Sequence, residues 1–167
     1  MRKRYPYIIV SLLISLFIYL FYRTERTVVN EIVIRIISFE TYALLKASVV
    51  SSLPLNDILI YSLPEGLWVF CITLTSKPYY VRLNNWRITC VLIPLIYAIG
   101  LEIFQLLHFT NGRFDFMDIW ISILFWSIGN YAFNEKSETQ NILMPLNSKT
   151  MVCLASYSIV YLSHVLK

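Results

Sequence analysis

Long stretches without a charged residue are the feature that most limits how this 167-residue chain can fold. No Asp, Glu, Lys or Arg lies between Arg4 and Arg23, and four later stretches are almost as poor in charge. A helix that crosses a membrane needs about 20 mostly apolar residues. The sequence therefore predicts five transmembrane helices, and these cover residues 5–22, 58–76, 88–109, 118–134 and 150–166.

The composition supports the same fold class. Hydrophobic residues make up 57% of the chain and charged residues 14%, with a mean hydropathy of +0.63. Soluble domains have about 25% charged residues, which cover their surface. We therefore expect an all-α polytopic helical membrane protein in which residues 1–167 form one domain. The three cysteines are isolated in apolar stretches, which favours neither disulfides nor a zinc site.

Residues 27–53 have a different pattern. Glu31, Arg35, Ser38, Tyr42 and Lys46 recur at helical spacing between apolar residues. A polar stripe on an apolar helix is typical of an element at a membrane interface, or of one packed along a bundle. The sequence predicts one amphipathic helix here, and both placements remain open.

Basic residues give an orientation for these helices. Arg2, Lys3 and Arg4 precede the first apolar stretch, and Lys77, Arg82 and Arg87 follow the second. Lys and Arg concentrate in cytoplasmic loops of membrane proteins, so a cytoplasmic N-terminus is predicted. Because the bases sit at the ends of apolar stretches, the net charge of +4 does not indicate a nucleic-acid partner.

The remaining polar residues converge on one end of the predicted bundle. Glu65 begins one helix, residues 102–118 connect two others, and all of these lie on the non-cytoplasmic side. Ionisable groups in apolar helices are costly, so each of them suggests a function. The candidate binding residues are Glu65, Glu102, Gln105, Arg113, Asp115 and Asp118.

Residues 88–133 resemble the VanZ-like family of small bacterial membrane proteins. The pattern that carries the resemblance is a Glu and a Gln three residues apart, a Gly-Arg turn, two acids, and a small residue in the next helix. The matching residues are Glu102, Gln105, Gly112, Arg113, Asp115, Asp118 and Gly129. Ser122 stands where the family usually has Asn, and Phe125 stands where it has a small residue, which predicts looser helix packing there.

The resemblance implies a protein of the bacterial cytoplasmic membrane and cell envelope, and the family name comes from an accessory factor in glycopeptide resistance. On this basis we expect the polar site to bind an anionic membrane lipid or a lipid-linked envelope precursor. Two alternatives remain open: a small accessory subunit that packs against a larger membrane protein, and a metal-dependent enzyme acting on lipid-linked phosphate. Whether the protein is an enzyme is left open by the sequence.

The chemistry of the candidate site also has two interpretations. Carboxylate and amide oxygens suit a hard divalent cation, although no cofactor is required by the pattern, and Arg113 suits a phosphate. Alternatively, Arg113 bridges Glu102 and Asp118 as a purely structural clamp, while Glu65 and Asp118 mark ordinary helix starts. No catalytic residue and no dedicated metal ligand is assigned from the sequence.

Overall fold

The computed structural model describes residues 4–23, 28–83, 86–109, 113–133, 139–142 and 148–165. Helices dominate these residues, and a small three-stranded sheet accompanies them. The helices are α1 (Tyr5–Phe21), α2 (Val28–Ile37), α3 (Phe39–Ser52), α4 (Asp57–Tyr61), α5 (Leu63–Ser76), α6 (Leu92–Leu106), α7 (Phe116–Ser127) and α8 (Ser148–Val165), and α7 continues into a π-helical turn, η2 (Ile128–Ala132). The strands are β1 (Tyr79–Leu83), β2 (Trp86–Thr89) and β3 (Gln140–Asn141).

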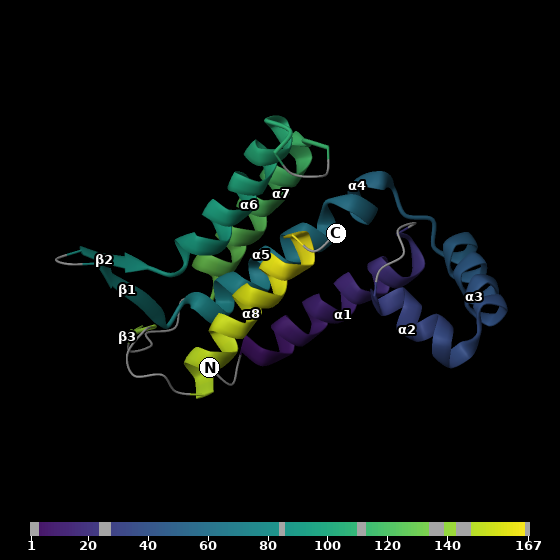
Figure 1. The fold of residues 1–167 in the computed structure, drawn as a ribbon, viewed down its shortest axis with the longest axis horizontal. Coiled ribbons are helices and arrows are strands. Elements are labelled where there is room, and N and C mark those ends of the chain that lie inside the picture. Colours follow the sequence, from purple (N-terminus) through teal and green to yellow (C-terminus); the bar gives the residue numbers. More distant parts are fainter. Residues whose placement is uncertain are drawn as a thin grey trace.

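Helix α5 forms the centre of the molecule. Most of its residues are buried, and α1, α6, α7 and α8 all pack along it. Figure 1 shows the β1–β2 hairpin extending from one side of this bundle and α2 and α3 from the opposite side. One part of the core therefore lies around α5, and a second apolar cluster at the base of the sheet packs Tyr79, Cys90 and Ile142 against Cys153 of α8.

The predicted membrane-spanning architecture is wrong. Within the ranges that the structure describes, no helix combines the length and the apolar character needed to cross a membrane. At about 1.5 Å per residue, the 17 residues of α1 extend only about 26 Å, and α5, with 14 residues, about 21 Å. The hydrocarbon core is about 30 Å thick. The predicted multi-pass location in a bacterial cytoplasmic membrane, with a cytoplasmic N-terminus, depended on these helices and is wrong for the same reason.

Local signals divide or shorten two of the predicted spans. The stretch at 58–76 divides at Ser62 into α4 and α5, because Asn56 caps α4 (its side chain accepts from Leu59 N at 2.9 Å) and Pro64 favours a new helix start. The stretch at 88–109 begins as strand β2, so α6 starts only at Leu92. Charge-poor sequence therefore did not imply continuous helix, and the all-α assignment missed the sheet.

The hairpin explains that error in physical terms. Strand β1 pairs antiparallel with β2, with Val81 opposite Ile88 and Arg82 opposite Arg87. Aromatic and β-branched residues fit such a pleated surface well. The short strand β3 then joins β1 in parallel. Charge content alone predicts a loop and the beginning of a helix in this region, because it does not register the aromatic and β-branched residues that favour strands.

The predicted amphipathic helix at 27–53 is two helices. Ser38 has a φ of 69° and its side chain accepts a hydrogen bond from Thr41 N at 3.4 Å, so it ends α2 and caps α3. Two side chains of α3 then bind backbone carbonyls at and just after the end of α1. Tyr42 OH donates to Leu20 O at 2.5 Å, and Lys46 Nζ donates to Arg23 O at 2.8 Å. Helix α3 is thereby fastened to the end of α1.

Two glycines set the close approach of α5 and α7. A Cβ on Gly66 would lie 2.5 Å from Ile121 Cγ2 and 2.6 Å from Phe125 Cδ2, so only glycine fits. Gly129 is less tight, since an added Cβ would lie 3.1 Å from Thr73 Cγ2 and the threonine would have to shift only slightly. The looser packing predicted at Phe125 is therefore wrong, because the small residue that accommodates the ring lies opposite it on α5. This contact brings the start of α5 next to the start of α7.

Candidate functional site

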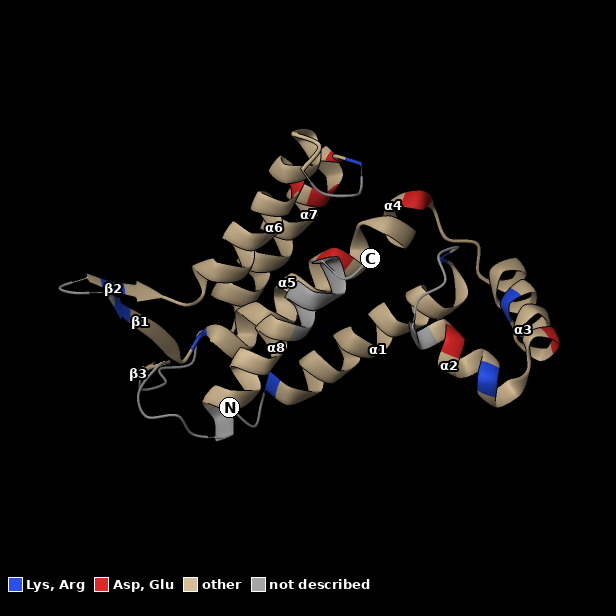
Figure 2. Cartoon of the chain, viewed as in Figure 1, with Lys and Arg blue, Asp and Glu red and all other residues tan. Residues whose placement is uncertain are grey.

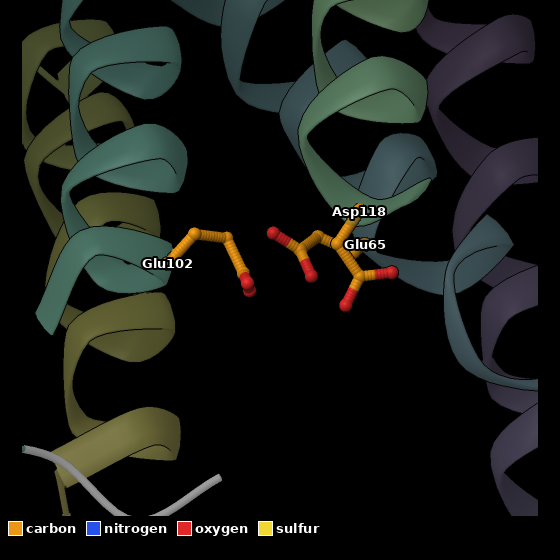
Figure 3. Close-up of side chains that lie close together, drawn as sticks. All are labelled: Glu65, Glu102 and Asp118. Carbon is orange, nitrogen blue, oxygen red and sulfur yellow. The ribbon is translucent and has the colours of Figure 1, made fainter. Parts of the chain in front are cut away.

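Three carboxylates from three different helices meet at one end of the bundle. Glu65 comes from α5, Glu102 from α6 and Asp118 from α7, and one oxygen of each lies within 4.8 Å of the other two. Figure 3 shows the three side chains in the space between the helices, with Glu102 reaching in from one side and Glu65 and Asp118 from the other. In Figure 2 the acidic residues of these helices lie away from the basic residues of the hairpin. We call Glu65, Glu102 and Asp118 the carboxylate triad.

The helix starts of α5 and α7 position two members of the triad. Glu65 follows Pro64 in the first turn of α5, and Asp118 lies in the first turn of α7. Asp115 caps α7, since its side chain accepts a hydrogen bond from Met117 N at 2.8 Å. The positive end of a helix dipole favours an anion, so both starts suit ionised carboxylates.

A tight helix end positions the third member. Helix α6 ends in a Schellman motif, in which His108 has a φ of 58°, His108 N donates to Gln105 O at 3.0 Å and Phe109 N donates to Phe104 O at 2.8 Å. His108 therefore has a clear role in ending the helix, and its side chain is exposed. Glu102 lies in the last turns of α6 and is only 2% exposed.

Hydrogen bonds hold the Glu102 carboxylate in place. Its Oε2 accepts from Asp115 N at 3.0 Å. The Gln105 amide, with its nitrogen facing Glu102, donates to Oε1 at 3.3 Å and to Arg113 O at 3.0 Å. Four of the residues predicted for the site thus contact one another around Glu102, although Asp115 and Arg113 contribute backbone groups to this network.

The Arg113 side chain does not act as the structural clamp that the sequence suggested. It is exposed, and within the described ranges it forms no ion pair with Glu102 or Asp118. Its neighbour Gly112, part of the predicted turn, lies outside the described residues. The carboxylates therefore face one another rather than a guanidinium.

Burial and mutual repulsion make ionisation of the triad unfavourable. Burial, followed by the charges of Asp118 and Glu102, raises the pKa of Glu65 to about 8. Burial also raises the pKa of Glu102, against the hydrogen bond from Asp115 N. The pKa of Asp118 is raised for the same main reason, and the Ser62 hydroxyl lowers it in part. Without a cation, the site retains protons that exposed carboxyls would have lost.

Three further residues belong to the site although the sequence did not single them out for it. Arg23, which follows α1, is close enough to lower the pKa of Glu65 and Asp118. Ser62 is buried beside Asp118, and Ser122 is fully buried one turn after Asp118 and lowers the pKa of Glu65. Arg23 is distant in sequence from residues 102–118, so only the packing of α1 against α5 reveals it.

Comparison with protein families, curated proteins and solved structures finds no match to this chain. The VanZ-like resemblance therefore rests on the quoted residues alone. The roles that it implied, in a bacterial membrane, in the cell envelope and in glycopeptide resistance, are corrected here. The described residues contain no membrane-spanning helix, and no matching family or curated protein supports these roles.

Proposed function

We propose that this protein binds a divalent cation through the carboxylate triad. The observation that carries the proposal is the convergence of Glu65, Glu102 and Asp118 from three helices, with one oxygen of each within 4.8 Å of the others. Like charges at such distances repel, and each group loses hydration on burial. A divalent cation would reverse both costs, because it replaces water as ligand and neutralises the carboxylates.

The spacing of the oxygens suits a hard cation. Ca²⁺ binds oxygen at about 2.3–2.6 Å and Mg²⁺ at about 2.0–2.1 Å, so opposite ligands of one ion lie about 4–5 Å apart. The bound of 4.8 Å on the triad oxygens fits the larger Ca²⁺ directly, whereas for Mg²⁺, whose ligands lie at most about 4.2 Å apart, the side chains would move closer together. Three carboxylates leave further coordination positions for water or a ligand, since these ions take about six or more oxygens.

Polar atoms without a hydrogen-bond partner add an independent argument. Asp118 Oδ1 and the Ser122 hydroxyl are buried, and neither forms a hydrogen bond of ordinary geometry in the part of the chain that is described. A buried polar atom left without a partner costs about 1–3 kcal/mol. A bound cation and its water ligands would satisfy both atoms, which the fold alone does not.

We therefore propose a cation as the first ligand of this site, in place of the anionic ligand that was expected from the sequence. An anion that approaches the triad directly would meet three carboxylates, which repel it. The binding of a lipid or precursor phosphate stays a prediction, and in this site it would need a bound cation first. The same condition applies to the expected metal-dependent enzyme.

Mn²⁺ titration tests the proposal, with isothermal calorimetry and electron paramagnetic resonance as readouts. We expect one tight Mn²⁺ per chain and a loss of affinity of about tenfold or more in Glu102→Gln and Asp118→Asn, because each removes a charged ligand. Glu40→Gln, which removes an exposed acid of α3, is the matched control and should bind like the unchanged protein. Equal affinity in Glu102→Gln and Glu40→Gln would reject the site.

A second candidate function, an accessory subunit, is favoured by the surface of α2 and α3. Ile36 is 75% exposed, Phe39 64% and Leu44 74%. These side chains lie on two helices that contact each other, and large exposed apolar side chains on neighbouring elements suit a protein–protein contact. A photo-crosslinking residue placed at position 36 should give one discrete adduct in cells, and its absence there would count against this function.

A further inference from the structure

Arg23 is held at the edge of the site, and within the residues that the structure describes it forms no ion pair with an acid. Its Nη2 donates to Tyr61 O at 3.0 Å, and its Cζ lies 5.0 Å from the centre of the Tyr19 ring and 5.1 Å from that of Tyr61. These contacts fix the plane of the guanidinium between two aromatic rings. The arginine is therefore positioned before any ligand arrives.

The donors of Arg23 are only partly used. Its Nε is buried and has no hydrogen-bond partner in the described structure. Its hydrogen bond to Tyr61, the residue before Ser62 at the start of α5, places the guanidinium beside that end of the site. Its charge also lowers the pKa of Glu65 and Asp118. In the described residues its side chain donates to a backbone carbonyl, although an arginine beside carboxylates commonly pairs with one of them.

From this arrangement we propose that the site takes a phosphate group that bridges a triad-bound divalent cation and the Arg23 guanidinium. The inference rests on the cation binding proposed above. Phosphate oxygens are good ligands for Mg²⁺ and Mn²⁺, and the planar donor fork of arginine matches a phosphate. Both partners would lie on the same side of the site, one from the helices α5, α6 and α7 and the other from the end of α1.

The order of binding follows from the charges. Without a cation the triad repels a phosphate, so phosphate affinity should be negligible in a metal-free protein. With the cation in place, the phosphate gains a metal ligand position and the arginine donors together. By linkage, phosphate should then tighten the binding of the cation by the same factor.

The test measures Mn²⁺ affinity with and without a phosphate compound. Separate arms use inorganic phosphate, glycerol 3-phosphate and inorganic diphosphate, which distinguishes a free phosphate from a phosphate ester such as a lipid headgroup. Parallel titrations without protein correct for Mn²⁺ that is complexed in solution. We expect at least one arm to raise Mn²⁺ affinity by about fivefold or more. If no arm raises it, the inference is wrong.

Variants separate this inference from the proposed function. Arg23→Gln should still bind Mn²⁺ but lose the effect of phosphate, whereas Arg87→Gln, an exposed arginine of β2, should keep both. Arg23→Lys retains the charge beside Tyr19 and Tyr61 but lacks the planar donor fork. It replaces Arg23→Gln in the phosphate measurements if the Gln variant does not fold. A protein that binds no Mn²⁺ refutes the proposed function itself. A phosphate effect that survives in both Arg23 variants refutes only the bridging role.

Discussion

Two buried polar clusters lie at different ends of α5, and they are built in opposite ways. At the end of α5, Ser76 Oγ donates to Ile72 O at 2.5 Å and lies 2.5 Å from Tyr157 OH, which is within 3.4 Å of Cys90 O. At the start of α5, the triad places three acceptors of the same charge together. The first cluster satisfies its polar groups within the fold. Among the described residues, the second leaves Asp118 Oδ1 and the Ser122 hydroxyl without a hydrogen bond of ordinary geometry.

The difference separates a structural cluster from a candidate binding site. Buried hydroxyl groups that are fully hydrogen-bonded hold α5 to α8 and need nothing further. Buried carboxylates that repel one another weaken the fold unless something is added to them. Functional groups are commonly retained at such a cost to stability. The predictions below test this contrast.

The largest expected effect concerns the close approach that creates the triad. Gly66→Leu should lower the free energy of unfolding by about 3 kcal/mol or more, because its side chain would overlap Ile121 and Phe125. It should also abolish Mn²⁺ binding by moving Glu65 away from Asp118. Urea denaturation and Mn²⁺ titration measure the two effects.

The matched control is Gly100→Ala on α6, where an added Cβ meets nothing within 4 Å. Because alanine is the better helix former, this variant should gain about 0.5–1 kcal/mol of stability and bind Mn²⁺ normally. If Gly66→Leu were as stable as this control, the tight packing of α5 on α7 would be refuted.

Substitutions that remove a polar group should change the free energy of unfolding in opposite directions in the two clusters. Tyr157→Phe should lower the free energy of unfolding by about 1–2 kcal/mol, since it removes the partner of a buried serine. Glu65→Gln, measured without metal at about pH 8, should instead raise it by about 1 kcal/mol, because it removes a buried charge. A destabilised Glu65→Gln protein would contradict the view that the triad is strained.

The pH dependence of stability should show the same strain. Burial raises the pKa of Glu65 from 4.5 to about 8, so the folded protein holds this proton at pH values where the unfolded chain has lost it. The resulting stabilisation is complete below about pH 4.5 and disappears as the pH rises toward about 8. Metal-free protein should therefore unfold at progressively lower urea concentrations from about pH 5 to pH 8. Saturating Mn²⁺ should flatten this trend, and an unchanged slope would argue against the triad as its ligand.

The smallest expected effect concerns Ser122. Its buried hydroxyl forms no ordinary hydrogen bond in the described chain, so Ser122→Ala should change the free energy of unfolding by less than about 1 kcal/mol. Mn²⁺ affinity should fall slightly if the hydroxyl contacts a water on the cation. Ser76→Ala provides the comparison at the other cluster, and it should be the more destabilised of the two proteins.

Much of the candidate site could be predicted from sequence because it is local. Glu102, Gln105, Asp115 and Asp118 lie within 17 residues of one another, where helix spacing and a tight turn fix their proximity. Glu65 was included because an acid in an apolar helix is unusual. The general helical character was also predicted, from long apolar stretches with little charge, although the membrane-spanning fold that we derived from them was wrong.

The remaining features depend on packing that charge content does not encode. Gly66 carries no signal in its own helix, and its role appears only when Phe125 lies against it. Arg23 reaches the site through the packing of α1 on α5, whereas the local sequence pointed to Arg113, which is exposed. The break at Ser38 depends on a left-handed backbone conformation that serine rarely adopts.

The fastening of α3 to α1 has a consequence for how the site could be controlled. Tyr22 OH donates to Leu53 O at 2.6 Å, and Lys46 holds the carbonyl of Arg23 itself. A shift of α3 would therefore also displace the backbone of Arg23. A molecule that binds to α2 and α3 and moves α3 would in this way change the distance between the Arg23 guanidinium and the triad.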